Sequence, residues 1–161
     1  MKILVVSDSH GAYSTLRSIV RRQSKAEVVL FLGDGEEDYN SVRMEFPEKM
    51  FIGVRGNNDW CSGLKNTELI TIEGIKILMT HGHTYHVKYG LEELKTSGRS
   101  AGADIVLFGH THVPHTEYED GMYIMNPGAV ANWPGQYGVI DIQNGQILLN
   151  NGQILLNTVK N

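Results

Sequence analysis

The sequence has a single cysteine, no long hydrophobic run and no excess of basic residues, and each absence excludes a class of protein. With Cys61 alone, no disulfide can form within the chain. The longest apolar run, residues 28–32, is far shorter than the roughly 20 residues that cross a bilayer. The apolar stretch at residues 3–6 is also too short for a secretory signal, whose apolar part has roughly 7–15 residues. We therefore expect a cytoplasmic protein that does not enter a membrane.

The charge balance is mildly acidic, with 14 Lys and Arg against 18 Asp and Glu and a net charge of −4. Because proteins hold long nucleic acids largely by neutralising phosphates, we expect no such partner. A small phosphorylated substrate in a local site remains compatible with this charge. The 161 residues show no linker or break in composition, so we expect one domain over residues 1–161.

Strand-like and helix-like segments alternate in the first part of the chain, and hairpin patterns follow. This order predicts a mixed α/β domain built in layers. The expected helices are residues 14–23, 39–46 and 91–100. The expected strands are residues 3–6, 28–32, 50–54, 69–72, 75–79, 105–108, 116–119, 122–125 and 137–142.

Asp, Asn and His residues follow five of these strands directly. The segments are residues 7–11, 33–35, 55–59, 80–83 and 109–112. Ligands of open α/β sheets bind outside the carboxyl ends of the strands, so these side chains should gather at one edge. Asp8 and His10, like His110 and His112, are two residues apart, and an extended backbone would point each pair at one spot.

Carboxylate and imidazole without thiolate is the ligand mixture of divalent first-row metals. One Asp can bridge two such ions about 3.5–4 Å apart, as in hydrolytic two-metal sites. Two divalent ions would outweigh the charge of Asp8, Asp34 and a bridging hydroxide. The remaining positive charge would attract a phosphate ester, and the hydroxide would attack it. The residues alone thus predict a phosphoester hydrolase.

The motifs Asp-x-His, Gly-Asp, Gly-Asn-x-Asp, His-Gly-His and Gly-His-x-His occur in this order between Asp8 and His112. Together they resemble the calcineurin-like metallophosphoesterase superfamily. The best match is its small prokaryotic phosphodiesterase branch, which is related to a retromer-type trafficking subunit. The resemblance implies an αββα sandwich of two facing mixed sheets with outer helices. It also implies phosphodiesterase activity and makes a homodimer plausible.

The resemblance further implies a dinuclear centre. Asp34 would bridge both ions, and the other ligands would be Asp8, His10 and His112 for the first ion and Asn57, His81 and His110 for the second. Family members commonly use Mn²⁺, and Ni²⁺, Zn²⁺, Fe or Mg²⁺ are the alternatives. Two other functions stay open: a phosphomonoesterase of the same fold, and a metal-binding interaction scaffold without catalysis.

Asn58 stands where many superfamily phosphatases carry a His that protonates the leaving oxygen. A neutral amide cannot act as a general acid near pH 7, a loss that typically costs about 10²–10⁴ in rate. We therefore expect diesters with good leaving groups to be preferred over alkyl monoesters. A simple turn role for Asn58 competes with a role in catalysis or substrate binding.

The remaining candidates have two interpretations each. Asp59 either orders its loop or contacts phosphate, and the first is favoured. His83 either contacts phosphate or lies behind the metal ligands. Trp60 either stacks on a substrate or packs in the protein, and packing is the commoner fate. Residues 36–38 are acidic and either form a solvated helix start or repel highly charged substrates.

The heptapeptide at residues 144–150 is repeated letter for letter at residues 151–157. Asn151 and Gly152 could form a hairpin turn that pairs the two copies. Alternatively, one copy is a redundant local duplication. Neither interpretation assigns chemistry to this tail.

Overall fold

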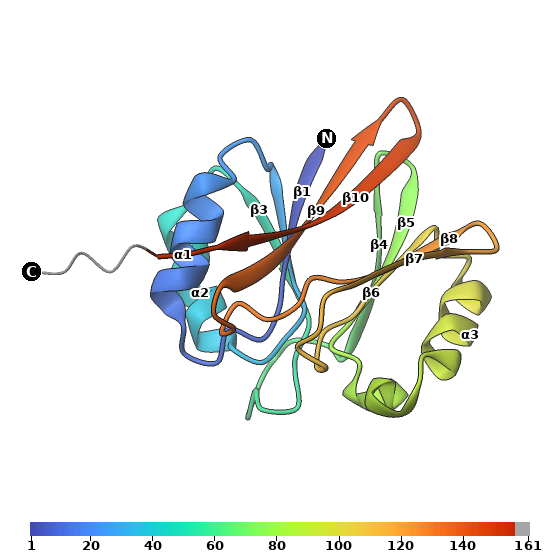
Figure 1. Cartoon of the computed structure of the whole chain (residues 1–161), viewed down its shortest axis with the longest axis horizontal. Helices are drawn as coiled ribbons and strands as arrows, with labels where there is room; N and C mark the ends of the chain where they lie inside the picture. Colours follow the sequence, from blue (N-terminus) through green and yellow to red (C-terminus); the bar gives the residue numbers. More distant parts are fainter. Residues whose placement is uncertain (157–161) are drawn as a thin grey trace, which may run out of the picture.

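The computed structural model describes residues 1–156, which form two five-stranded sheets that face each other with three α-helices outside them (Figure 1). The first sheet has the order β10 (Gln146–Ile154), β9 (Gly135–Gln143), β1 (Lys2–Val6), β2 (Val28–Phe31) and β3 (Met50–Gly53). Strands β1, β2 and β3 are parallel, and β9 and β10 are antiparallel additions at one edge.

The second sheet has the order β4 (Thr67–Ile72), β5 (Ile75–Thr80), β6 (Ile105–Leu107), β8 (Met122–Asn126) and β7 (His115–Glu119). Strands β5, β6 and β8 are parallel, while β4 and β7 are antiparallel edge strands. The predicted layered fold with two mixed sheets is therefore confirmed, and the expected strands at residues 69–72 and 75–79 pair as a hairpin, β4 with β5.

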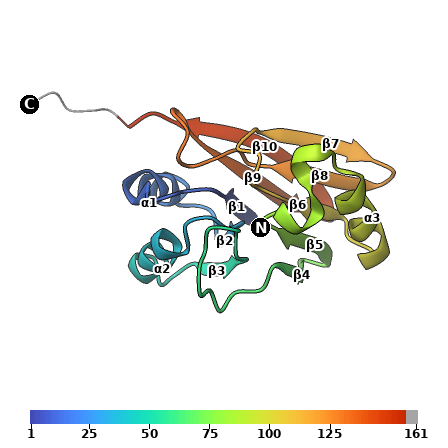
Figure 2. The ribbon, with the colours of Figure 1, turned by 90° about the horizontal axis from the view of Figure 1, so that it is seen from below.

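The helices cover the outer faces of the sheets. Helices α1 (Tyr13–Arg22) and α2 (Glu36–Glu45) lie on the first sheet, and α3 (Glu92–Ala101) lies on the second (Figure 2). Two short 3₁₀ turns, η1 (His83–Tyr85) and η2 (Val87–Tyr89), precede α3. Helix α2 begins three residues before the expected position because the acidic residues 36–38 form its first turn, where the helix dipole favours negative charge. No helix in residues 1–156 combines the length and apolar character needed to cross a bilayer.

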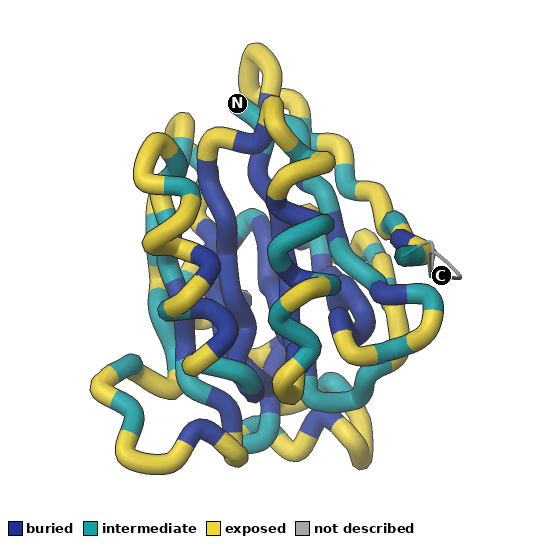
Figure 3. The backbone as a smooth tube through the Cα atoms, turned by 90° about the vertical axis from the view of Figure 1, so that its left-hand side faces the viewer, coloured by how far each residue is buried: buried dark blue, intermediate teal, exposed yellow. Residues whose placement is uncertain are grey.

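The main core lies between the two sheets. Fully buried side chains such as Ile3 and Leu30 from the first sheet meet Met79 and Leu107 from the second. The central strands are accordingly the most deeply buried part of the backbone (Figure 3). This core fixes the two sheets relative to each other, and so fixes the ends of their parallel strands.

The hairpin that Asn151 and Gly152 could have formed between the two copies is contradicted by the pairing of this segment with β9. Residues 146–150 of the first copy and 151–154 of the second form one continuous strand, β10, and the turn lies at Asn144 and Gly145 in the first copy. Strand β9 is nine residues long, and its pairing holds β10 extended over the same length. Asn157, the last residue of the repeat, lies outside the described residues.

The odd period of the repeat places equivalent side chains on opposite faces of the sheet. Successive residues of a strand alternate between faces, so a shift of seven residues changes the face. Ile147 accordingly packs against the core between the sheets, whereas Ile154 is buried in the core beneath α1 and α2. The Asn151 side chain also links the sheets, since it contacts Thr116 Oγ1 at 2.6 Å and donates to the carbonyl of Asn126 at 2.9 Å.

Candidate metal centre

The loops after β1, β2, β3, β5 and β6 carry the predicted site residues, and these loops meet at one end of the sandwich. Among the described Asp, Glu, His and Cys residues, two groups could each hold a metal ion. The first consists of Asp8, His10 and His112, and the second of Asp34, His81 and His110. In each group the ligand atoms lie within 4.8 Å of one another. Six of the seven predicted ligands are therefore brought together.

Five of these six residues have a left-handed backbone conformation. Asp8, His10, Asp34, His110 and His112 have φ angles between 44° and 67°. Asp and His adopt this region more readily than most residues, but it remains uncommon, and such strain clusters at functional sites. It also explains a wrong expectation: the segment is not extended, so His110 and His112 point into different groups instead of converging.

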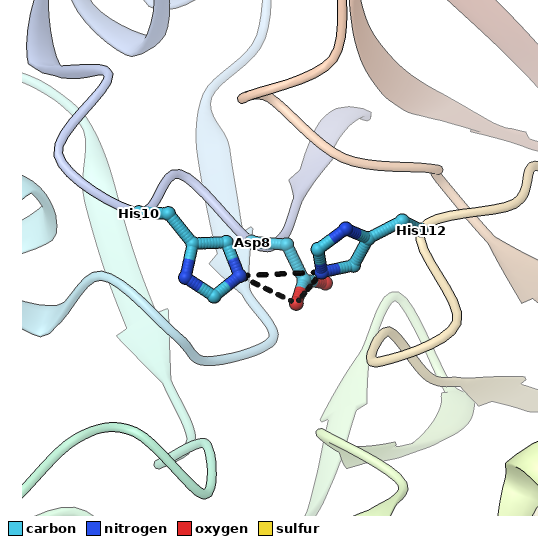
Figure 4. Close-up of side chains that lie close together, drawn as sticks. All are labelled: Asp8, His10 and His112. Carbon is cyan, nitrogen blue, oxygen red and sulfur yellow. Dashed lines mark hydrogen bonds and ion pairs between the residues drawn. The ribbon is translucent and has the colours of Figure 1, made fainter.

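In the first group, the two histidine side chains converge on one carboxylate oxygen of Asp8 (Figure 4). Asp8 Oδ1 lies 3.0 Å from His112 Nε2 and 3.4 Å from His10 Nε2, and the two Nε2 atoms are 3.2 Å apart. The other carboxylate oxygen, Oδ2, accepts hydrogen bonds from the Ser7 hydroxyl and the His110 backbone N–H. Asp8 is therefore oriented from behind, and Oδ1 faces the histidines.

Asp8 Oδ1 provides a test of whether the residues fit a metal ion. Asp8 is fully buried, and Oδ1 has no hydrogen-bond partner in the described part of the chain. An unpaired buried carboxylate oxygen is costly, and ring nitrogens carrying lone pairs would repel it and each other. A cation among these atoms removes both costs. The donor set of oxygen and imidazole nitrogen therefore fits a divalent metal.

In the second group, His81 is held in a defined tautomer. Its Nδ1 lies 2.7 Å from the carbonyl of Leu32, and because a carbonyl only accepts, Nδ1 must carry the proton. His81 Nε2 is left to face Asp34 Oδ2 at 3.3 Å and His110 Nδ1 at 3.2 Å. A backbone carbonyl behind a histidine is the usual arrangement for a metal ligand.

Asp34 lies between the two groups. Its Oδ2 is 3.3 Å from His81 Nε2 of the second group and 3.7 Å from His10 Nε2 of the first. Asp8 also approaches the second group, but its Oδ1 is 3.9 Å from His81 Nε2, a longer distance than the two contacts of Asp34. The position of Asp34 fits the predicted bridging role.

Burial and charge act in opposite directions on the ionisable groups of this site. Burial disfavours the charged form of Asp34, but the hydrogen bond and charge of His81 and the hydrogen bonds from Asn58 outweigh it and hold the pKa of Asp34 well below its usual range. Burial and the neighbouring His81 lower the pKa of His110 to about 4. His110 is thus neutral above that pH, the state in which imidazole binds metals.

Asn57 and Asn58 are placed differently from the sequence prediction. Asn57 is exposed, and its role as a ligand remains a prediction. The side chain that contacts Asp34 is that of Asn58, whose Nδ2 donates to Oδ2 at 2.7 Å while its backbone N–H donates to Oδ1 at 2.8 Å. Asn58 is therefore more than a turn residue, because it orients the central carboxylate.

Asp59 orders the loops around Asp34. Its carboxylate accepts four backbone N–H groups at 2.7–3.0 Å, from Gly56, Asp34, Gly35 and Glu36. Burial opposes its ionisation, but these hydrogen bonds prevail and lower the pKa of Asp59. The geometry agrees with the favoured interpretation of Asp59 as an organiser of its loop.

The stability that Asp59 contributes is expected to depend on pH. Its pKa in the folded protein is below the ordinary value of 3.8, so its contribution is present above that value and is lost as the pH falls through the folded-state pKa. Urea unfolding should show Asp59→Asn to be less stable than the parent by about 2–3 kcal/mol at pH 7, with a smaller gap near pH 3. Asp120→Asn, at an exposed carboxylate, is the control. An equal gap at both pH values would contradict this role.

His83 lies beside the second group. Its ring centre is 5.5 Å from that of His81 and 6.2 Å from that of His110, and its Nδ1 is buried without a hydrogen-bond partner among the described residues. Burial and the nearby His81 lower the pKa of His83. Whether this ring contacts phosphate or supports the ligands stays a prediction.

Two further expectations are corrected by long-range contacts. Asp38 is not part of a solvated face, because it is buried and accepts hydrogen bonds from the Ser9 hydroxyl at 2.6 Å and the Gly11 N–H at 2.9 Å. Trp60 does not pack in the protein, since 82% of it is exposed. Asn126, which begins an Asn-Pro-Gly segment that resembles a family element, donates to the carbonyl of Gly109 and so supports the His110 loop.

Comparisons with known proteins agree with this geometry. A model described as the calcineurin-like phosphoesterase superfamily domain matches residues 1–145. The probable metallophosphoesterase YsnB of Bacillus subtilis is 32% identical over 131 residues, covering 81% of this chain and 75% of that protein. The phosphodiesterase YfcE of Escherichia coli is 28% identical over an alignment of 171 positions, covering 88% of each chain. Vps29 of Entamoeba histolytica, solved in complex with Zn²⁺, has a TM-score of 0.75 at 25% identity and covers 95% of this chain and 99% of that one.

Proposed function

The chain belongs to the calcineurin-like phosphoesterase superfamily, and we propose that it is a metal-dependent hydrolase of small phosphodiesters. The observation that carries this proposal is Asp8 Oδ1, a fully buried carboxylate oxygen that has no hydrogen-bond partner among residues 1–156 and faces histidine nitrogens from three loops. The relatives named metallophosphoesterase and phosphodiesterase support the reaction class.

The residues of the two groups would have different roles in holding the metal ions. Asp8, His10 and His112 would hold one ion, His81, His110 and Asn57 a second, and Asp34 would contact both. Two divalent ions bound here would acidify a water molecule and offset the charge that develops on phosphate. We propose Mn²⁺ as the preferred ion, with Ni²⁺, Zn²⁺, Fe and Mg²⁺ as alternatives.

The reaction balances with water alone. The water oxygen forms a new bond to phosphorus, and the bond from phosphorus to the leaving alcohol breaks. The electron pair of that bond stays on the alcohol oxygen, and one proton from water ends there or in solution. Asn58 cannot supply this proton, which favours diesters whose leaving group is stable as an anion.

A panel of aryl phosphates tests this function. Bis(4-nitrophenyl) phosphate and 4-nitrophenyl phosphate are compared with Mn²⁺, Ni²⁺, Zn²⁺ or Mg²⁺, and with a chelator as control. We expect metal-dependent release of nitrophenolate that is faster from the diester. The same rate with chelator would contradict the metal requirement, and faster monoester hydrolysis would favour a phosphomonoesterase. No turnover with any ion would favour a non-catalytic scaffold.

Asn58→His is expected to raise hydrolysis of methyl phosphate, an alkyl monoester whose leaving oxygen must be protonated, about tenfold relative to bis(4-nitrophenyl) phosphate, whose leaving group departs without an acid. A histidine at this position adds a group that can protonate the leaving oxygen, an effect typically of about 10²–10⁴ when the geometry is ideal. Asn58→Ala is the matched control, because it removes the same amide without adding an acid. Equal monoester rates in both variants would show that this position does not reach the leaving oxygen.

The cytoplasmic location, the homodimer and the single domain over residues 1–161 stay predictions from the sequence.

A further inference from the structure

A groove of about 610 Å³ extends from the metal-ligand residues along α2. At one end it is lined by His10 and Asp34, and it reaches Met44 on α2 and Trp60 in the loop after β3. Its volume is in the range typical of small-molecule sites. A phosphate held at the two ligand groups would therefore direct one of its substituents into this groove.

The inner end of the groove lies near Asp8 Oδ1, a buried carboxylate oxygen that a positive charge would stabilise. The His10 ring lines the groove, and its Nε2 is 3.4 Å from the buried Asp8 Oδ1, which has no hydrogen-bond partner in the described chain. The groove thus opens from the candidate metal centre and is not a separate surface depression.

The charges along the groove are all of one sign. Its lining includes the carboxylates of Asp34, Glu36, Glu37, Asp38 and Asp59 and no Lys or Arg. Asp38 and Asp59 are occupied by hydrogen bonds within the loops. Glu36 and Glu37 form no ion pair with any residue between 1 and 156. An anionic substituent, such as a further phosphate, would be repelled here, and a cationic one attracted.

Two apolar side chains flank these carboxylates and are open to solvent. Trp60 is 82% exposed and Met44 is 80% exposed. Large apolar side chains in such a place are free to contact a ligand. An indole face attracts an ammonium group through its quadrupole, more strongly than other aromatic side chains do.

We infer that this groove binds a cationic alcohol substituent of the substrate, meaning a small alcohol that carries a primary or quaternary ammonium group. This inference rests on the proposed phosphodiesterase function. The phosphate would lie at the metal-ligand residues and the ammonium group near Trp60, Glu36 and Glu37. A nucleobase could also stack on Trp60, but it would leave both glutamates without a partner, so the charge favours the cation.

Substrates with a constant leaving group test the inference. The 4-nitrophenyl phosphate diesters of choline, 3,3-dimethylbutanol and methanol all release nitrophenolate, and the first two differ only in N⁺ against carbon. We expect kcat/KM for the choline ester to exceed that of the dimethylbutyl ester about tenfold. Equal values, or faster turnover of the 5′-thymidine ester than of the choline ester, would overturn the inference.

Substitutions in the groove test whether its side chains cause the preference for the choline ester over the dimethylbutyl ester. Trp60→Ala and Glu37→Gln should each reduce the ratio of choline to dimethylbutyl ester toward one. Trp133→Ala and Glu48→Gln are the matched controls, because Trp133 is also largely exposed and neither residue lines the groove. They should leave the ratio unchanged. A ratio that survives in Trp60→Ala would place the cation elsewhere and overturn the inference.

A binding measurement separates failure of this inference from failure of the proposed function. The chain has two tryptophans, so Trp133→Phe leaves Trp60 as the only indole. Choline should change its fluorescence at concentrations where 3,3-dimethylbutanol does not, with or without metal. If the methyl ester is hydrolysed but choline has no such effect, the groove inference fails and the function stands. If no ester is hydrolysed, the function fails, and a choline-specific signal still supports the groove as a cation site.

Discussion

Replacing Asp34 by Asn is expected to lower phosphodiesterase activity by at least about a hundredfold to a thousandfold. The substitution keeps the shape of the side chain but removes the negative charge that faces His81 at 3.3 Å and His10 at 3.7 Å. An amide also keeps only one oxygen that can bind a metal, because its nitrogen presents N–H donors in place of the second carboxylate oxygen. The fold should survive, because Asp34 lies in a loop and Asp59 continues to bind its backbone N–H.

The measurement combines kcat/KM on bis(4-nitrophenyl) phosphate with the metal content of the purified variant. Asp141→Asn is the control, because Asp141 is a partly exposed carboxylate on β9, far from the metal-ligand residues in the chain, and its ion pair with Lys2 spans 4.0 Å. The control should keep parental values for both quantities. Full turnover by Asp34→Asn with unchanged metal content would refute the assignment of Asp34.

Replacing Gly56 by Ala is expected to disrupt the site almost as severely. A Cβ atom on Gly56 would lie 2.0 Å from Asp34 Oδ1 and 2.4 Å from the Asp34 backbone nitrogen. These atoms cannot easily move, since Asn58 and Asp59 hold them through hydrogen bonds. We expect a loss of about 1–3 kcal/mol in the free energy of unfolding and a loss of activity of at least about a hundredfold.

Gly63→Ala provides a matched control in the same loop region. A Cβ atom on Gly63 has no other atom within 4 Å, and its φ angle is not positive. Its stability should therefore change by less than about 0.5–1 kcal/mol, and in the favourable direction if at all. Urea unfolding and diester hydrolysis of both variants make the comparison. Parental stability and activity in Gly56→Ala would show that the β3 loop does not constrain Asp34.

The strand ends explain why so much of the candidate site can be predicted from the sequence. Asp8, Asp34 and His81 each follow a run of apolar residues that forms a buried parallel strand. Parallel strands of one sheet end at the same edge, so the position of a residue after its strand fixes its place in the fold. The pairing of the groups across the two sheets was implied by the family resemblance and not by this rule.

The backbone conformation of the loops could not be predicted in this way. His110 and His112 separate because both have positive φ angles, which an alternation rule for extended chain does not include. Likewise, Asn58 and Asp38 acquire their roles from partners 24 and 29 residues distant in the chain. Spacing in the sequence contains no information about such contacts.

The repeated heptapeptide near the end of the chain is a further case in which long-range pairing, and not the local pattern, decides the structure. Asn151 and Gly152 are compatible with a hairpin turn, but β9 offers a partner strand nine residues long, and pairing along it extends β10 from Gln146 in the first copy to Ile154 in the second. A local turn preference contributes less free energy than the full set of hydrogen bonds between β9 and β10 together with the burial of Ile154.

The sequence by itself determined the layered α/β fold, the reaction class and the residues that can bind metal, because these depend on side-chain chemistry and on hydrophobic patterns along short segments. The tertiary structure alone decided that Asn58 orients Asp34, that Asp38 is buried against the loop after β1, and that Trp60 is exposed in the groove that Glu36 and Glu37 also line. Those features arise where loops that are distant in the chain pack together, and the energy of such packing depends on distances that no local pattern records.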